Sequence, residues 1–229
     1  SSAAALWSVG ALLWAVLSAR FSNRCRASMK KQKVGGWVRH SRDTVYDNPW
    51  ITVTHETVTA PSGRDGIYGV VHFKNVSVGV VPLDDEGFTW LVKQSRYSLD
   101  IHTWEIPEGG APKGEEPLQA AQRELEEETG LLAGRWTELL RLHTSNSVCD
   151  EAAVLYLAQE LSEGVQQLEA TEDIEVRRLP LREAIEMALD GRITDALSVA
   201  ALLRLQPLLH RDAAATDTLL APEALGSLT

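Results

Sequence analysis

The chain is poor in cysteine and in basic residues. Only two cysteines occur among its 229 residues, Cys25 and Cys149, and their spacing excludes a cysteine-based metal motif. The simplest interpretation is a reduced, cytoplasmic compartment. Lys and Arg number 22 against 32 Asp and Glu; residues 1–43 carry +7, and residues 44–229 carry −17. Because affinity for a nucleic-acid backbone relies on basic residues, this acidic body predicts no nucleic-acid partner.

Long apolar runs are also lacking. The best one, residues 3–17, is short for a membrane span. Arg20, Arg24 and Arg26 follow it, whereas a secretory signal carries its charge before the run. The first methionine is Met29, a candidate start. Two interpretations of residues 1–28 stay open, a disordered tail or translated leader and a membrane or transit segment. We expect no membrane contact unless this segment is retained as an anchor.

What the chain does have is a concentration of carboxylates at helical spacing. If the stretch Arg123-Glu124-Leu125-Glu126-Glu127-Glu128 forms a helix, three carboxylates share one face at i, i+3 and i+4. They belong to Glu124, Glu127 and Glu128. The second face is apolar and would pack against a core: Leu118, Ala121 and Leu125. Like charges at this spacing repel, so the cluster is either solvated or holds a cation. Mg²⁺ favours carboxylates, water and substrate phosphates.

The flanking residues identify the pattern. Nudix hydrolases carry the signature G-x5-E-x7-R-E-U-x-E-E-x-G-U, where U is bulky and aliphatic. This sequence resembles them at every fixed position: Gly109, Glu115, Arg123, Glu124, Leu125, Glu127, Glu128, Gly130 and Leu131. A solvated, Glu-rich surface helix is the alternative, but it does not explain why the glycines, Glu115 and Arg123 fall in register. We call residues 109–131 the Nudix box.

The resemblance implies a role for each matched residue. The metal, Mg²⁺ with Mn²⁺ as an alternative, would be held by the box carboxylates Glu124, Glu127 and Glu128, of which the last two are also assigned to catalysis. Glu115 would assist the metal site, and the backbone carbonyl of Glu108 would add a ligand. Arg123, which is also assigned to catalysis, would orient a neighbouring glutamate through a charge-assisted pair. A metal that clamps phosphate oxygens and acidifies a bound water points to a diphosphate substrate.

The segments around the box narrow that substrate. Trp104-Glu105-Ile106-Pro107-Glu108-Gly109 is similar to the lead-in of ADP-ribose pyrophosphatases, and Gln94-Ser95-Arg96-Tyr97 resembles a segment whose arginine contacts substrate. Substrate binding is therefore assigned to Arg96, Glu105 and Trp104. Glu151 closes the loop 145–151 and is the candidate general base. That loop reads Ser-Asn-Ser where those enzymes often have Ser-Pro-Gly. The expectation therefore covers ADP-ribose and related nucleoside diphosphate sugars.

The remaining patterns predict an α/β protein. Strands are expected at 51–59, 67–73, 76–82, 88–94, 136–144, 152–159 and 174–178, and helices at 181–189 and 196–206. Residues 84–87 resemble a hairpin connection between two strands. With the resemblance, this implies an N-terminal extension over 1–36, a Nudix domain over 37–209 and a tail over 210–229. The implied fold is an α/β/α sandwich around a mixed sheet, with an antiparallel strand segment at its N-terminus.

The resulting prediction is Mg²⁺-dependent hydrolysis of the diphosphate bond of ADP-ribose or a related nucleoside diphosphate sugar, giving a nucleoside monophosphate and a sugar phosphate. The resemblance also implies a homodimer. Alternatives within the enzyme class are a GDP-mannose hydrolase and a dinucleotide polyphosphate hydrolase. An alternative outside it is a regulator that binds ADP-ribose without hydrolysing it. Such regulators usually lose box carboxylates, and this chain keeps all of them.

Overall fold

The computed structural model describes residues 31–168 and 173–210, which fall into two units. The first consists of the chain up to Thr44 together with Thr54–Gly69, and the second of Val45–Val53 and everything from Val70 onward. Our interpretations of residues 1–28 and of the tail beyond residue 210 lie outside the described residues. Within the described ranges, no helix is long and apolar enough to cross a membrane.

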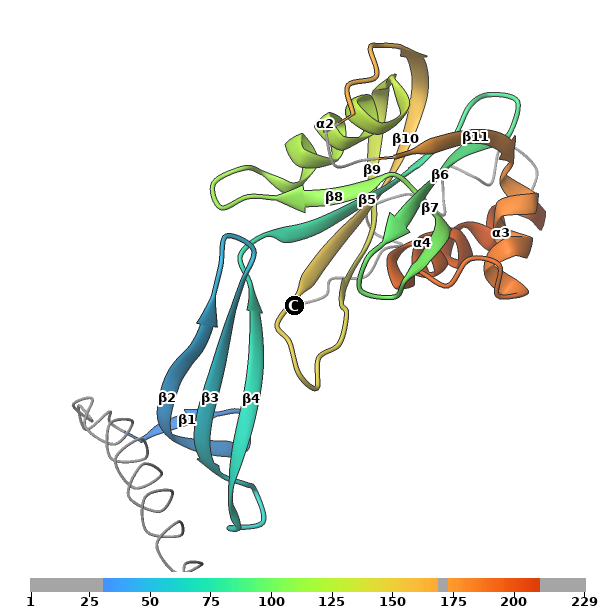
Figure 1. Ribbon diagram of the computed structural model, residues 1–229. Coiled ribbons are helices and arrows are strands. Elements are labelled where there is room, and N and C mark those ends of the chain that lie inside the picture. The colour runs from blue at the N-terminus through green and yellow to red at the C-terminus, as the bar shows by residue number, and fades with distance from the viewer. Residues whose placement is uncertain (1–30, 169–172, 211–229) are drawn as a thin grey trace, which may run out of the picture. The chain divides into compact units, whose positions relative to one another are not determined.

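The N-terminal strands form an antiparallel sheet in the order β1-β2-β3-β4, as expected (Figure 1). Its members are β1 (Gln32–Val34), β2 (Trp37–Asp47), β3 (Ile51–Thr59) and β4 (Asp65–Phe73). Alternate residues of β3 are buried because successive side chains point to opposite faces: Thr54, Glu56 and Val58. The carboxylate of Glu56 is paired with Arg39 and Arg42 on β2, so a buried charge in this sheet is compensated.

A mixed sheet organises the second unit. Its order is β8-β5-β10-β9, from β8 (Glu108–Ala111), β5 (Val76–Pro82), β10 (Ala152–Glu163) and β9 (Leu131–His143). β10 runs parallel to β5 and antiparallel to β9, and β5 runs antiparallel to β8. β10 therefore lies in the interior of the sheet, with a partner strand on each side.

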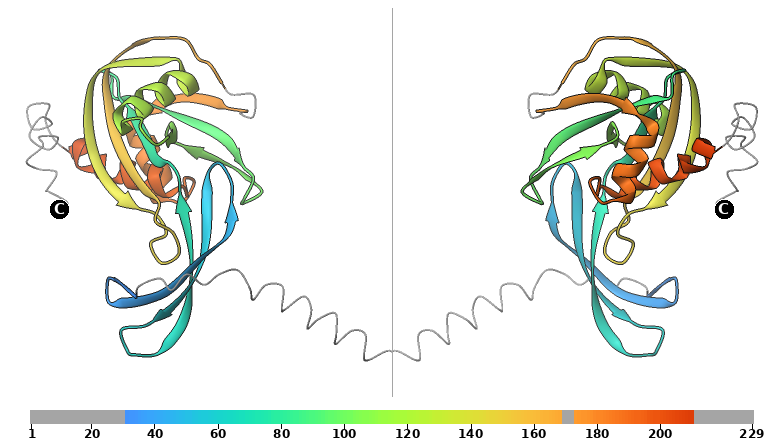
Figure 2. Two further views of the ribbon diagram at one scale, coloured as in Figure 1. Left: turned by 90° about the vertical axis from the view of Figure 1, so that its left-hand side faces the viewer. Right: turned by 90° about the vertical axis from the view of Figure 1, so that its right-hand side faces the viewer.

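Helices cover both faces of this sheet (Figure 1 and Figure 2). Alternate residues of β10 divide between two hydrophobic clusters. Val154, Tyr156 and Ala158 pack with α2 (Pro117–Thr129). The intervening residues Ala153, Leu155 and Leu157 pack with α3 (Leu181–Leu189) and α4 (Ala196–Leu205). The period of two along the strand thus builds the expected α/β/α sandwich. A short 3₁₀ helix, η1 (Gln206–His210), follows α4.

The structure corrects the prediction of a hairpin at residues 84–87. The chain does reverse there, because Asp84 accepts hydrogen bonds from the amides of Glu86 and Phe88. The two flanking strands nevertheless belong to different sheets. β5 stays in the mixed sheet, whereas β6 (Phe88–Arg96) joins a three-stranded antiparallel sheet between β11 (Glu175–Pro180) and β7 (Ile101–Glu105). Turn chemistry specifies the reversal but not the partner of each strand.

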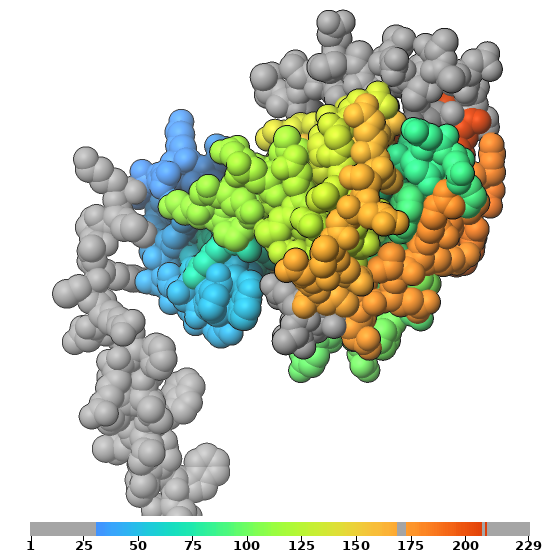
Figure 3. Space-filling model, turned by 90° about the horizontal axis from the view of Figure 1, so that it is seen from above, coloured from blue at the N-terminus to red at the C-terminus, as the bar shows by residue number. Residues whose placement is uncertain are grey.

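The box helix α2 begins with Pro117 and ends with Thr129, and the capping residue Gly130 adopts a left-handed conformation with φ 70°. Ala120, Ala121 and Leu125 are buried, whereas Leu118 is 37% exposed and does not share the expected core face. The last carbonyls of a helix need partners from elsewhere. The segment after β10 supplies two such partners. The amide of Gln167 donates to the backbone carbonyl of Glu127, and the side-chain amide of Gln166 donates to the backbone carbonyl of Glu128. Figure 3 shows this segment in orange beside yellow-green α2.

Candidate active site

The carboxylates of the box gather around one guanidinium group. Arg123 donates from Nη1 to Glu124 at 2.8 Å and to Glu127 at 2.9 Å. Its Nη2 donates to Glu115 at 3.1 Å and to the carbonyl of Gly110 at 3.0 Å. Hydrogen bonding to Glu115 raises the pKa of Arg123, against the opposing effect of burial. One cation therefore organises three carboxylates that would otherwise repel each other, and it ties them to the loop before the helix.

Two of the helix carboxylates are shielded from solvent. Burial raises the pKa of Glu124, partly offset by Arg123 and by a hydrogen bond from the amide of Gly110. Glu128 is only 2% exposed, and its Oε2 accepts a hydrogen bond from the amide of Glu108 at 3.0 Å. Glu127 is more open, with a side chain 33% exposed. The start of β8 and the face of α2 are thus connected at the point where the box loop begins.

These residues fit a hard divalent cation. Their donor atoms are carboxylate oxygens, which Mg²⁺ and Mn²⁺ favour over nitrogen or sulfur. Gly109 brings its backbone so close that an added Cβ would lie 2.1 Å from the carboxyl carbon of Glu124. Only glycine allows this approach. The donor atoms suit such a cation, and the metal assignment made for Glu115, Glu124, Glu127 and Glu128 stays a prediction.

A second network surrounds Arg96 at the end of β6. Its guanidinium pairs with both Glu105 and Glu108. Burial opposes the charge, but hydrogen bonding to Glu105 and the proximity of Glu108 raise the pKa of Arg96. Glu105 is 1% exposed and also accepts hydrogen bonds from Gln94 and Thr103. The structure therefore places Glu105 as a buried support for Arg96.

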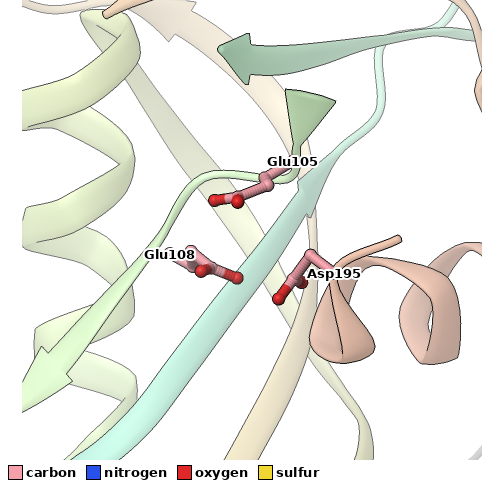
Figure 4. A group of neighbouring side chains, drawn as sticks. All are labelled: Glu105, Glu108 and Asp195. Carbon is pink, nitrogen blue, oxygen red and sulfur yellow. The ribbon is translucent and has the colours of Figure 1, made fainter. Parts of the chain in front are cut away.

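Both glutamates that pair with Arg96 lie near a third carboxylate, that of Asp195 (Figure 4). Oxygen atoms of Glu105, Glu108 and Asp195 lie within 4.8 Å of one another. Burial raises the pKa of Glu108 well above its ordinary value, and Asp195 and Glu105 raise it further. Oε2 of Glu108 is buried without a hydrogen-bond partner. Sequence reasoning gave Glu108 only a backbone role and missed Asp195. The available signal for Asp195 was its position directly before the apolar helix α4, whose N-terminus it caps by accepting from the amide of Ser198 at 2.7 Å.

A cavity of about 450 Å³ opens beside these groups. Its lining combines residues from both networks with the loops near them: Trp50, Phe73, Asn75, Ser77, Arg96, Glu108, Gly109, Gly110, Thr144, Glu151, Asp195, Ala196 and Leu197. Trp50 and Phe73 are 66% and 39% exposed. Neither was singled out from the sequence, because an aromatic residue next to a strand end has no feature that is specific to a binding site. The cavity is large enough for a small organic ligand.

Two predicted site residues end up in different surroundings. Glu151 lines the cavity together with Gly109 and Arg96, so the structure brings the candidate base close to the box. Trp104 instead packs against the main core, and Nζ of Lys93 lies 5.7 Å from the centre of its ring. This placement agrees with a packing role for Trp104.

Comparison with known proteins identifies the same family as the box residues. The NUDIX domain model matches residues 73–202, and the model of the nucleoside diphosphate sugar hydrolase N-terminal domain matches residues 37–71. The chain is 34% identical over 168 residues to the ADP-ribose pyrophosphatase of Bacillus subtilis (strain 168), covering 72% of this chain and 90% of the relative. It is 33% identical over 167 residues to that of Mycobacterium tuberculosis (strain ATCC 25618 / H37Rv), covering 71% and 80%.

A solved structure described as an ADP compounds hydrolase matches with a TM-score of 0.69. It covers 80% of this chain and 97% of that one at 23% identity, a likeness that concerns the fold alone. The matched domain extends over more than half of the chain and contains the complete box. The chain belongs to the Nudix hydrolase family, and it resembles the ADP-ribose pyrophosphatases of that family.

Proposed function

We propose that the chain hydrolyses the diphosphate bond of ADP-ribose or a related nucleoside diphosphate sugar in the presence of Mg²⁺, giving a nucleoside monophosphate and a sugar phosphate. The observation that carries the proposal is the carboxylate cluster around Arg123, beside a cavity of about 450 Å³ that Glu151 also lines. The similarity to two ADP-ribose pyrophosphatases supports the substrate class.

The metal would be held by the box carboxylates Glu115, Glu124, Glu127 and Glu128 and by the carbonyl of Glu108. When bound, such a cation polarises the diphosphate and lowers the pKa of water. The protein's own contribution is positional. Arg123 fixes the directions of the glutamate side chains. The hydrogen bond from the amide of Glu108 to the carboxylate of Glu128 holds the start of the box loop against α2. Glu151 would accept the proton of the attacking water in the cavity.

Substrate binding would fall to residues that line the cavity. Arg96 remains our proposal for contact with the substrate because it reaches the cavity wall. Glu105 would act through Arg96, which it holds from a buried position. Trp104 packs against the main core, and its assignment to substrate binding stays a prediction. The homodimer and the cytoplasmic location also remain predictions; light scattering on the purified protein tests the first.

The experiment is a hydrolysis assay of the full chain with Mg²⁺ and a panel of ADP-ribose, other nucleoside diphosphate sugars, GDP-mannose and dinucleotide polyphosphates, with product identification. Glu127→Gln and Glu128→Gln should each lower kcat at least about 100-fold. Glu126→Gln makes the same charge change on the same helix and should leave kcat unchanged. Full activity of both site variants would refute the site. Calorimetric binding of ADP-ribose without product would favour the regulator.

A further inference from the structure

We propose that Ser77 and Thr144 are positioning residues for Glu151 and fix the orientation of its carboxylate at the cavity wall. The inference rests on the proposed function, since it assigns a task to the side chains around the base that this function requires. The observation that carries it is that both carboxylate oxygens of Glu151 are held by hydroxyl groups from two different segments of the chain.

The geometry of these two contacts is tight. Ser77 Oγ donates to Oε1 of Glu151 at 2.8 Å, and Thr144 Oγ1 donates to Oε2 at 2.6 Å. Both distances lie within the range of ordinary hydrogen bonds from a hydroxyl group to an oxygen atom. Each oxygen therefore has its own donor, and rotation of the carboxylate would break both hydrogen bonds.

The two donors reach Glu151 from the two strands that flank β10 in the mixed sheet. Ser77 lies on β5 and is paired in register with Ala153 on β10. Thr144 directly follows β9, the other neighbour of β10. Because Glu151 directly precedes β10, its side chain is held between the strands that flank β10. Strand pairing thus sets the distance between the two hydroxyl groups, which makes them rigid supports.

The loop before Glu151 has its own anchor. The amide of Phe73 donates to Oδ1 of Asp150 at 3.0 Å, and Nδ1 of His72 lies 2.6 Å from Oδ2. The amide of Asp150 donates to the carbonyl of Val71 at 3.2 Å. These contacts fix the backbone next to Glu151 but do not touch its carboxylate. Orientation of that group is therefore the task of the two hydroxyl groups.

The arrangement leaves the carboxylate able to react. An ionised carboxylate offers about four lone-pair positions, and the two hydroxyl groups occupy one on each oxygen. Ser77, Thr144 and Glu151 all line the cavity, so the remaining positions are available to a water molecule there. Because a displacement of about 1 Å from the reacting geometry can lower a rate about 100-fold, a support of this kind affects turnover more than substrate affinity.

The test is steady-state kinetics of the full chain on the best substrate of the panel, with Mg²⁺. Ser77→Ala and Thr144→Val should each lower kcat roughly tenfold, with KM unchanged within about twofold. Ser77→Thr and Thr144→Ser keep the hydroxyl group and should retain most of the activity. Matched controls that remove a hydroxyl elsewhere in the same sheet, Ser162→Ala on β10 and Thr137→Val on β9, should match the wild type.

A double-mutant cycle separates positioning from an independent effect. In a Glu151→Gln background, removal of either hydroxyl should cause no further loss of kcat, since the group that it orients has lost its function. The proposal is overturned if the losses multiply in that background, or if the single variants keep full kcat. Melting temperatures report whether a variant folds. If Ser77→Ala does not fold, the double-mutant cycle with Thr144→Val, together with the rescue by Thr144→Ser, decides whether the proposal holds.

Failure of this inference can be distinguished from failure of the proposed function. Loss of activity in Glu127→Gln but not in Glu151→Gln would keep the proposed function and remove the inference. If the panel gives no turnover, the proposed function fails, and crystal structures of the wild type and of the Ser77→Ala/Thr144→Val double variant still test the support. A rotated Glu151 carboxylate in the double variant supports the inference, and an unchanged carboxylate contradicts it.

Discussion

An added Cβ at Gly109 would lie 2.1 Å from the carboxyl carbon of Glu124, so the side chain of Glu124 occupies the space that a Cβ at position 109 would need. Gly109→Ala must therefore displace the glutamate. We expect activity at low Mg²⁺ to fall at least about tenfold, because the carboxylate no longer points at the metal position. A titration of the rate with Mg²⁺ should show the midpoint at a higher concentration.

The matched control is Gly66→Ala on β4, where an added Cβ meets open space. This variant should keep the Mg²⁺ midpoint of the wild type. An unchanged midpoint in Gly109→Ala as well would mean that Glu124 is not part of the metal site.

Replacement of Arg123 by lysine should show that its planar group matters beyond its charge. Arg123 donates to Glu115, Glu124, Glu127 and the carbonyl of Gly110, which a lysine ammonium cannot reach together. We expect Arg123→Lys to lower kcat at least about tenfold while the fold persists. Circular dichroism and steady-state kinetics measure the two quantities. Arg192→Lys, which alters an exposed pair with Asp190, should leave both unchanged; equal kcat values for the two variants would contradict this assignment.

The turn after β5 predicts a pH-dependent stability. Burial opposes the shift, but the amide of Phe88 and the side chain of Arg178 lower the pKa of Asp84 below its ordinary value of 3.8. A carboxyl with a lowered pKa stabilises the fold above its ordinary pKa, and this contribution is lost as the pH falls through the folded-state pKa. Asp84→Asn should therefore lower the melting temperature by a few degrees at pH 7, and the difference from the wild type should shrink below about pH 3.8.

Thermal melts between pH 2 and pH 8 check this expectation. The adjacent Asp85 is exposed, so Asp85→Asn provides a control with the same chemical change. A difference between Asp84→Asn and the wild type that stays constant over the whole range would show that the charge of Asp84 plays no part.

The aromatic lining of the cavity predicts an effect on binding. Trp50 lines the cavity although 66% of its surface is exposed. An exposed indole beside a ligand cavity offers a flat surface to a base, and stacking of this kind is worth about 1–3 kcal/mol per base. Trp50→Ala should therefore raise KM about tenfold and change kcat little. Tyr97→Ala removes an aromatic side chain that is 98% exposed and should leave KM unchanged; a lower kcat with unchanged KM in Trp50→Ala would contradict the binding role.

The parts of the site that the sequence could predict are those encoded locally. Arg123, Glu124, Glu127 and Glu128 lie on one helix, so their spacing alone places them together. The strands β5 and β10 were also recognisable, because both carry apolar runs. In contrast, β8 consists of Glu-Gly-Gly-Ala, which has little strand propensity; its conformation depends on pairing with β5.

The parts that could not be predicted depend on contacts between distant segments. Asp195 lies near Glu108 only because α4 packs on the mixed sheet, and no local sequence pattern predicts this contact between distant segments. Glu105 was assigned to substrate, yet tertiary packing buries it against Arg96. Leu118 had the correct spacing for the core face, but it lies in the first turn of α2 and remains 37% exposed.

The parallel pairing of β10 with β5 has a consequence for folding. Ser77 and Glu151 are 74 residues apart in the sequence, and α2 is made entirely from the chain between them. Contacts of long sequence separation form slowly, whereas a helix forms within microseconds. In a refolding experiment the helical signal should therefore appear well before enzymatic activity, since the candidate base reaches its place only when the last interior strand of the sheet inserts between its neighbours.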